Sequence, residues 1–232
     1  MRGRRLRRAA LAGVLGWLGA SVLGLSMLGL GASGADAQDR GLGVLQGAAA
    51  RYQRVDALCA QFTQHLSVPL LQEDRTGVGR LCQASPNLFA MRFSDPEGDA
   101  VVVDGESTWV YFPSLDPKQV FKGPVEASAG GRDFHREFLE RPEEKYHVRY
   151  EAAEAVDGIA THRLRLVPKQ PAGYTAAVLW IDIREPLLRR IRIVEENESV
   201  RTITLRDIDL DATPDPQMFS FTPPPGALVI SR

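Results

Sequence analysis

The sequence has few of the residues and motifs on which enzymatic chemistry depends. Only two of its 232 residues are cysteines, and no C-x-x-C pair, G-x-S-x-G or S-x-x-K motif, or G-x-x-x-x-G-K loop occurs. The four histidines are far apart in the sequence: His65, His135, His147 and His162. These absences argue against a metal centre, a nucleophilic active site and a phosphate-binding loop. We therefore expect a protein that is not an enzyme and that holds no metal or cofactor.

The N-terminal segment has the composition of a secretory signal. Residues 1–37 combine five arginines with an apolar run from Ala9 to Ala32, and they end in the small-residue sequence Ala35-Asp36-Ala37. We expect cleavage after Ala37, a protein located outside the cytoplasm, and a single domain over residues 38–232. The alternative is an uncleaved membrane anchor, because the apolar run approaches the roughly 20 residues that span a bilayer.

The charge of the remaining chain is low and slightly negative. Without residues 1–37 it keeps 23 basic and 28 acidic residues, distributed along its whole length. No basic patch therefore attracts phosphate groups, which argues against binding to nucleic acid or to an anionic membrane.

The rest of the pattern predicts one helix followed by a β-sheet. Apolar residues at spacings of three and four predict an amphipathic helix over residues 42–58: Leu42, Leu45, Ala49, Tyr52, Val55 and Leu58. Alternating segments then predict strands over residues 60–66, 89–93, 146–152, 161–167, 176–183, 188–195, 201–210 and 219–221. The polar turns between these strands favour one antiparallel sheet over β-α-β units.

Two hairpins can be predicted in more detail. The strand formers of residues 100–113 meet at Asp104-Gly105, a pair that favours a tight turn. A second hairpin centred near residues 70 and 71 would place Cys59 opposite Cys82. We expect these two cysteines to form a disulfide in an oxidising compartment.

A short helical segment interrupts the strands. Residues 114–132 are rich in proline, glycine and serine and predict a long loop, and the following residues 133–139 carry Phe134, Phe138 and Leu139 on one side. Pro142 is expected to stop this helix, which we interpret as a lid. Because two short helices must cover one face of about ten strands, part of that face is left for an apolar ligand.

Several sequence segments occur in an order and spacing that are typical of one family. They are residues 60–64 (AQFTQ), 79–81 (GRL), 86–89 (PNLF), 95–96 (DP), 103–106 (VDGE), 109–111 (WVY) with Pro113, and 219–224 (FSFTPP) with Gly226. Over about residues 42–230 the chain resembles the periplasmic outer-membrane lipoprotein carrier family LolA.

This resemblance implies a mainly β fold with some α: an unclosed antiparallel β-barrel, or half-barrel, with helices over a hydrophobic concave face. It also implies a periplasmic, monomeric chaperone that takes acylated lipoproteins from an inner-membrane lipoprotein-releasing ABC transporter to an outer-membrane acceptor. On this basis the predicted cavity residues are Phe62, Leu81, Phe89, Met91, Phe93, Trp109 and Tyr111. The predicted lid residues are Phe134, Phe138 and Leu139.

One residue departs from the family pattern. The family usually has an arginine before the proline of the P-N-L-F segment, where it helps to hold the lid closed, and this chain has Ser85. This departure keeps open a carrier of another lipid, such as a glycolipid or phospholipid. The shared scaffold also leaves open a regulatory domain that senses lipoproteins.

Overall fold

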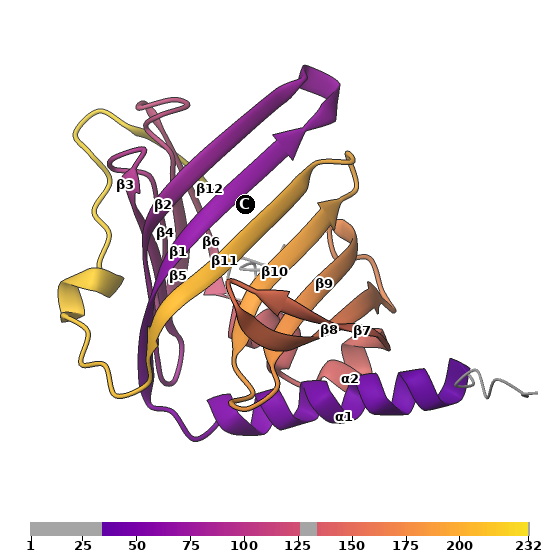
Figure 1. The fold of residues 1–232 in the computed structure, drawn as a ribbon. Helices are drawn as coiled ribbons and strands as arrows, with labels where there is room; N and C mark the ends of the chain where they lie inside the picture. Colours follow the sequence, from indigo (N-terminus) through magenta and orange to yellow (C-terminus); the bar gives the residue numbers. More distant parts are fainter. Residues whose placement is uncertain (1–33, 126–133, 232) are drawn as a thin grey trace, which may run out of the picture. The chain divides into compact units, whose positions relative to one another are not determined.

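The computed structural model describes residues 34–125 and 134–231. Their regular elements form one 12-stranded sheet with short helices beside it (Figure 1). The elements are α1 (Gly34–Tyr52), β1 (Ala57–Val68), η1 (Pro69–Leu71), β2 (Glu73–Ala84), β3 (Leu88–Asp95), β4 (Ala100–Asp104), β5 (Ser107–Tyr111), β6 (Gln119–Pro124), η3 (His135–Leu139), α2 (Pro142–Lys145), β7 (Tyr146–Val156), β8 (Ile159–Pro168), β9 (Tyr174–Asp182), β10 (Leu188–Glu195), β11 (Val200–Asp209), η4 (Pro216–Phe219) and β12 (Leu228–Ser231).

The sheet is curved and does not close. Its strand order is β12-β6-β5-β4-β3-β2-β1-β11-β10-β9-β8-β7, so β12 and β7 lie at opposite edges. Neighbouring strands are antiparallel except for β12, which pairs with β6 in parallel. This arrangement confirms the predicted half-barrel, and it corrects the expectation of an antiparallel sheet at one edge.

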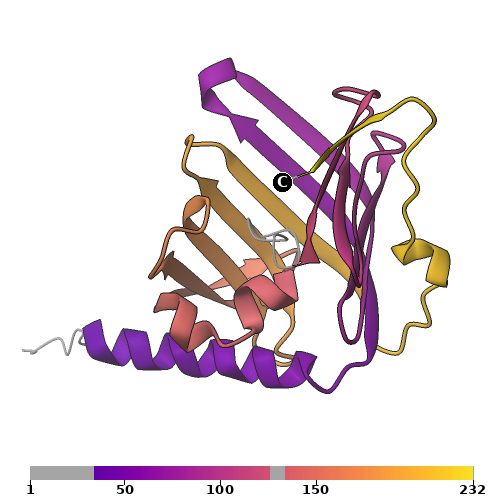
Figure 2. The same cartoon turned by 180° about the vertical axis from the view of Figure 1, so that it is seen from behind.

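The helices cover the concave face. Helix α1 crosses one end of the sheet and contacts β7, β9, η3 and α2, and the segment from η3 to α2 lies within the curve of the sheet (Figure 2). Leu45, Ala49 and Tyr52 of α1 belong to the same buried cluster as the inward-facing strand residues. The apolar faces of helix and sheet thus form one core, as the spacing of these residues predicts.

A second buried cluster lies on the outer face of the sheet. It contains Cys59, Cys82, Ala90, Ala100, Val102 and Phe219. Cys59 and Cys82 face each other across β1 and β2 and form a disulfide, which confirms the predicted register and pairing. The chain after β11 covers this cluster, and the guanidinium of Arg92 fixes it by donating to the carbonyl oxygens of Gln217, Met218 and Ser220.

Four predictions about individual elements are wrong. The first helix ends at Tyr52, and Leu58 already belongs to β1. Strand β6 lies inside the predicted loop, and its Pro124 is tolerated because it is the last residue of the strand, beyond the residues that pair with β12. Pro142 opens helix α2, where a proline needs no amide partner. Residues 219–221 form no strand, since Phe219 ends the short helix η4.

The start of α1 can be compared with the end of the predicted secretory signal. The helix begins at Gly34, so the expected cleavage position after Ala37 lies within its first turn. None of the helices in the described ranges is long and apolar enough to cross a membrane.

Candidate functional site

The concave face carries a row of large apolar side chains from β1, β2 and β3. Five predicted cavity residues belong to its buried cluster: Phe62, Leu81, Phe89, Met91 and Phe93. Cross-strand pairing brings them together, because Leu81 lies opposite Met91 and their strands share one inward face. The rings of Phe62 and Phe93 meet edge to face with their centroids 4.8 Å apart. Sequence alternation therefore places these five side chains correctly.

Two glycines of β2 make room for this aromatic packing. A Cβ atom at Gly77 would lie 2.7 Å from the Phe93 ring, and one at Gly79 would lie 2.1 Å from the carbonyl oxygen of Arg92. Both distances are too short for any other residue type. The glycines thus allow the ring of Phe93 to lie across β2 and to reach Phe62.

Trp109 and Tyr111 lie on the other face of the sheet, so their predicted place in the cavity is wrong. Trp109 pairs with Val102, whose side chain belongs to the outer cluster, and both aromatic rings pack against Phe221. The indole of Trp109 also donates to Asp104 at 2.7 Å. The residue of β5 that packs against the concave cluster is Val110.

The predicted lid residues cover the concave face. Phe134, Phe138 and Leu139 are buried, with exposed fractions of 3% or less. The ring of Phe134 lies 5.9 Å from that of Phe89, and the ring of Phe138 lies 6.1 Å from that of Tyr146. We call residues 134–139 the lid segment. Its apolar side chains occupy the space that a ligand on this face would need.

A polar cluster fixes the middle of the lid segment. The hydroxyl of Tyr146 lies 2.7 Å from Oε1 of Glu137 and 2.6 Å from the hydroxyl of Tyr174, which donates to the same carboxylate. The Nζ of Lys145 donates to the carbonyl oxygen of Glu137 at 3.3 Å. We call Glu137, Tyr146 and Tyr174 the Glu137 cluster. It is a polar attachment in otherwise apolar surroundings.

The environment of this cluster keeps both phenols neutral. Burial is the main cause that raises the pKa of Tyr146 and of Tyr174 far above the ordinary value, and the nearby carboxylate of Glu137 adds to both shifts. Sequence analysis missed these three residues. Glu137 is one of several charged residues in its segment and carries no distinguishing signal, and its tyrosine partners lie on strands that the sequence alone does not bring together.

The two hollows that the described residues leave on the concave face are small. Two hollows of about 70 and 80 Å³ adjoin at the end nearest the β1–β2 turn, and both are lined by Gln64, Leu66, Phe93 and Phe112. Pockets that hold small ligands usually measure roughly 300–1,000 Å³. The described structure is therefore a closed form.

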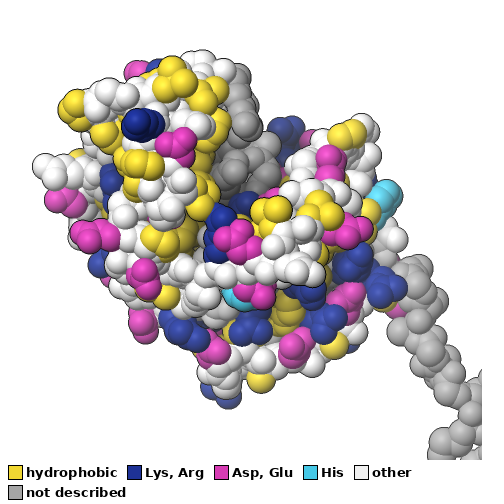
Figure 3. Space-filling model, turned by 90° about the horizontal axis from the view of Figure 1, so that it is seen from above, with side chains coloured by type: hydrophobic (Ala, Val, Ile, Leu, Met, Phe, Trp, Pro, Cys, Tyr) yellow, Lys and Arg dark blue, Asp and Glu magenta, His cyan; other side chains and the backbone are white. Residues whose placement is uncertain are grey.

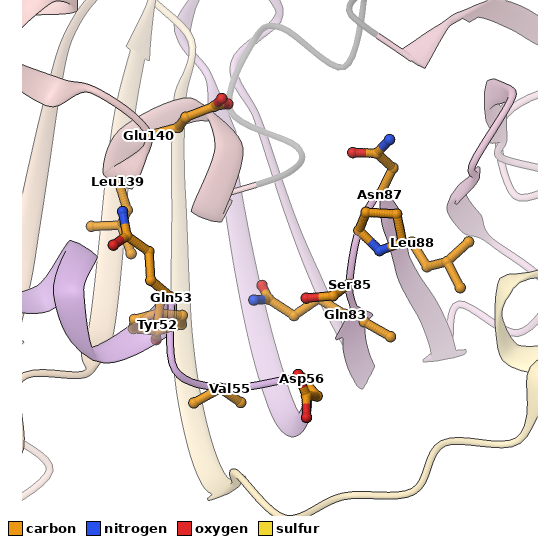
Figure 4. Close-up of a pocket in the computed structure, with 12 residues that line it drawn as sticks. Tyr52, Gln53, Val55, Asp56, Gln83, Ser85, Asn87, Leu88, Leu139 and Glu140 are labelled. Atoms are coloured by element: carbon orange, nitrogen blue, oxygen red, sulfur yellow. The ribbon is translucent and has the colours of Figure 1, made fainter.

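A larger pocket lies at the other end of the lid segment, next to Ser85. It measures about 370 Å³, and Figure 4 shows Leu139 and Glu140 on one side of it and Ser85 with Asn87 on the other. Asp56 also lines it, and its carbonyl oxygen accepts a hydrogen bond from the amide of Ser85 at 2.8 Å. The pocket thus lies where the family pattern has a larger, cationic side chain.

The outer surface is uneven in character. Seen from above, hydrophobic side chains gather on one part of the molecule, and basic and acidic side chains mix on another (Figure 3). The most exposed large apolar residues are Leu70 and Leu71 of η1, with exposed fractions of 75% and 68%.

An open half-barrel with an apolar interior and a helical cover is built to enclose an apolar ligand, and its interior offers no acid–base or nucleophilic constellation among the described residues. This defines the class as a binding protein for apolar groups. The chain belongs to the family of the outer membrane lipoprotein carrier protein LolA, whose model matches residues 53–222.

Individual relatives agree with this assignment. The outer-membrane lipoprotein carrier protein of Haemophilus influenzae is 24% identical over 212 residues, which cover 90% of this chain and 92% of the relative. That of Glaesserella parasuis is 27% identical over 214 residues, covering 89% and 92%. The fold alone is similar to that of a solved structure, an uncharacterised conserved protein from Thermus thermophilus, with a TM-score of 0.52 and 15% identity over 82% of this chain and 98% of that one.

Proposed function

We propose that this protein carries acylated lipoproteins through the periplasm by enclosing their acyl chains on the concave face. The observation that carries the proposal is the buried apolar face beneath a lid segment that one polar cluster holds in place. An acyl chain can replace the contacts of Phe134 and Phe138 with other apolar contacts of the same kind. The lid is therefore the part that must leave when cargo enters.

The transfer needs no covalent step. Burial of apolar surface stabilises a bound chain by roughly 25 cal/mol per Å². When the lid closes again, its own apolar side chains are buried in place of the acyl chain, so the empty form is also stable. Cargo then moves to any acceptor whose apolar site binds the chains more strongly than the concave face does. Weak net binding, rather than chemistry, allows release.

The partners and the route belong to the same proposal. Residues 1–37 would direct export, and cleavage after Ala37 would leave residues 38–232 as a single carrier domain. We propose that an inner-membrane lipoprotein-releasing ABC transporter supplies the cargo and that an outer-membrane acceptor receives it. Residues 38–232 carry 23 basic and 28 acidic residues, and this net negative charge does not favour adhesion to an anionic membrane surface between these two steps.

Native mass spectrometry tests this proposal directly. The purified protein is mixed with an acylated lipoprotein or with the same lipoprotein lacking its acyl chains. We expect a one-to-one complex with the acylated form alone. Equal binding of both forms, or binding of neither, would contradict the proposal, and retention of a free lipid in place of the lipoprotein would indicate a carrier of another lipid.

A pair of variants locates the binding surface. Phe112 lines both hollows of the concave face and packs against the ring of Phe93, whereas Val167 lies on the outer face of β8. Phe112→Glu should abolish the complex, because a carboxylate would be buried against acyl chains. Val167→Glu should leave it intact. The opposite result would place the ligand on the outer face.

A further inference from the structure

The concave face is not apolar throughout. At the end nearest the β1–β2 turn, three inward-facing side chains carry hydrogen-bond donors: Gln64, Arg75 and Arg201. We call them the polar rim. Arg75 on β2 and Arg201 on β11 both lie opposite Leu66 of β1, so Arg75, Leu66 and Arg201 form one cross-strand row. Adjacent strands are about 4.8 Å apart, which places the two arginines roughly 10 Å from each other.

Gln64 occupies the next row inward. It lies opposite Ile203 and Gly77, and its side-chain amide has no hydrogen-bond partner among the described residues. The amide lines both hollows together with the ring of Phe93. An amide that faces an apolar hollow without a partner leaves a donor and an acceptor available to a ligand.

The two arginines have spare donors of the same kind. Arg201 is largely buried, and of its N–H groups only those of Nη2 meet a carboxylate, that of Glu195. Arg75 uses Nε and Nη2 on Glu73, at 2.8 Å each. A guanidinium has five N–H donors, so both arginines keep donors without a partner in the described chain.

The charge around these donors is already balanced. Glu73 and Glu195 pair with the two arginines, and the buried carboxylate of Asp99 lines the same hollow as Arg75. The rim therefore offers donors but no net positive charge. Neutral carbonyl acceptors suit such a site, whereas a phosphate or a free carboxylate would meet nearby carboxylates.

We propose that the polar rim binds the ester and amide carbonyl oxygens that join acyl chains to the glyceryl-cysteine head of a lipoprotein. This inference rests on the proposed function, because it assumes that the chains lie on the apolar face beyond Phe93. The linkage would then sit at the rim, and the peptide would leave the half-barrel beside the β1–β2 turn. The rim would thus select neutral diacylglyceryl groups over anionic lipids.

Three probes of equal chain length test the selection. They are a diacylglyceryl-cysteine lipopeptide, its ether-linked analogue without the two ester carbonyls, and phosphatidylglycerol. We expect the wild-type protein to bind the ester lipopeptide about tenfold more tightly than the ether analogue, as two net hydrogen bonds would give. Phosphatidylglycerol should bind more weakly than the ester lipopeptide.

Two variants assign the effect to the rim. Gln64→Leu should reduce the ester-to-ether ratio about threefold, and the double variant Arg201→Leu with Glu195→Leu, which leaves no unpaired charge, should reduce it further. Gln61→Leu is the matched control, because Gln61 is exposed on the outer face of the same strand. Its ratio should equal that of the wild type.

The possible failures are distinguishable. Equal binding of ester and ether probes by the wild-type protein, a Gln64→Leu variant with an unchanged ratio, or tighter binding of phosphatidylglycerol would each overturn the polar rim and leave the carrier function intact. Failure to bind any of the three probes would overturn the proposed function and the rim together.

Discussion

Removing the hydroxyl of Tyr146 should open the lid. Tyr146→Phe keeps the ring that packs against Phe138 but removes the donor 2.7 Å from the carboxylate of Glu137. A hydrogen bond to a charged group contributes about 1.5–3 kcal/mol. The substitution removes this contribution from the closed form. It leaves the open form unaffected, because Glu137 is then exposed to water and does not depend on the Tyr146 hydroxyl. The ratio of open to closed molecules should therefore rise about 10- to 100-fold.

Two measurements on the same variant should move in opposite directions. Urea unfolding should show a lower free energy of unfolding, because the native protein is closed. The affinity for a fluorescent diacyl lipopeptide, measured by anisotropy, should rise by up to the same 10- to 100-fold, since apparent affinity scales with the fraction of binding-competent molecules. A simple loss of structure would lower both quantities.

Tyr150→Phe is the matched control for this experiment. Tyr150 lies on the same strand, but its hydroxyl is near Nδ1 of His162 at 3.4 Å and forms no hydrogen bond with Glu137. Its variant should bind the lipopeptide as the wild type does. The reasoning is refuted if Tyr146→Phe is destabilised while its affinity for the lipopeptide stays equal or falls.

Three further predictions concern the rest of the molecule. Reducing the disulfide between Cys59 and Cys82, which are 23 residues apart, should remove about 3 kcal/mol of stability and lower the melting temperature by roughly 6–12 °C, whereas a double alanine variant should not respond to the reductant. Ser85→Arg should fill the pocket beside Glu140, hold the lid closed and weaken lipopeptide binding about two- to fivefold, with Ser85→Ala unchanged. Because the folded-state pKa values of Tyr146 and Tyr174 in the Glu137 cluster are raised, the stability they contribute is present below about pH 10 and falls above it by about 1.4 kcal/mol per pH unit for each phenol. Burial also raises the pKa of Tyr52, to about 12, so Tyr52 adds to the same slope. Urea unfolding between pH 8 and 11 should show the combined slope, and Tyr146→Phe should reduce it by about one third.

The hairpin register and the five buried cavity residues could be predicted because local patterns determine them. A turn centred at residues 70 and 71 pairs Cys59 with Cys82, and alternation then places Phe62 and Leu81 on one face. Gln64 at an inward position breaks that alternation, which was a visible sign of a polar group inside. Local period and turn chemistry therefore suffice for this part of the half-barrel.

The face of Trp109 could not be predicted in the same way. Strand β4 is buried on both faces, so Val101, Val102 and Val103 show no alternation that would fix the orientation of β5. The cover of the outer face comes from residues around Phe221, more than 100 positions later in the chain. The size of Trp109 suggested a cavity residue, but its ring packs against Phe221, which lies far away in the sequence.

The described polar contacts of the lid segment lie at its middle and not beside Glu140, which follows its C-terminal end. Glu137 is held by two phenols, whereas Glu140 lies beside the pocket at Ser85 and has no ion-pair or hydrogen-bond partner in the described structure. The family resemblance implies an arginine at that position, which would hold that end. Closure then depends on the Glu137 cluster, so Tyr146→Phe should open the lid and Ser85→Arg should reverse part of that effect. If the double variant binds lipopeptide as tightly as Tyr146→Phe alone, the two contacts do not act on the same opening.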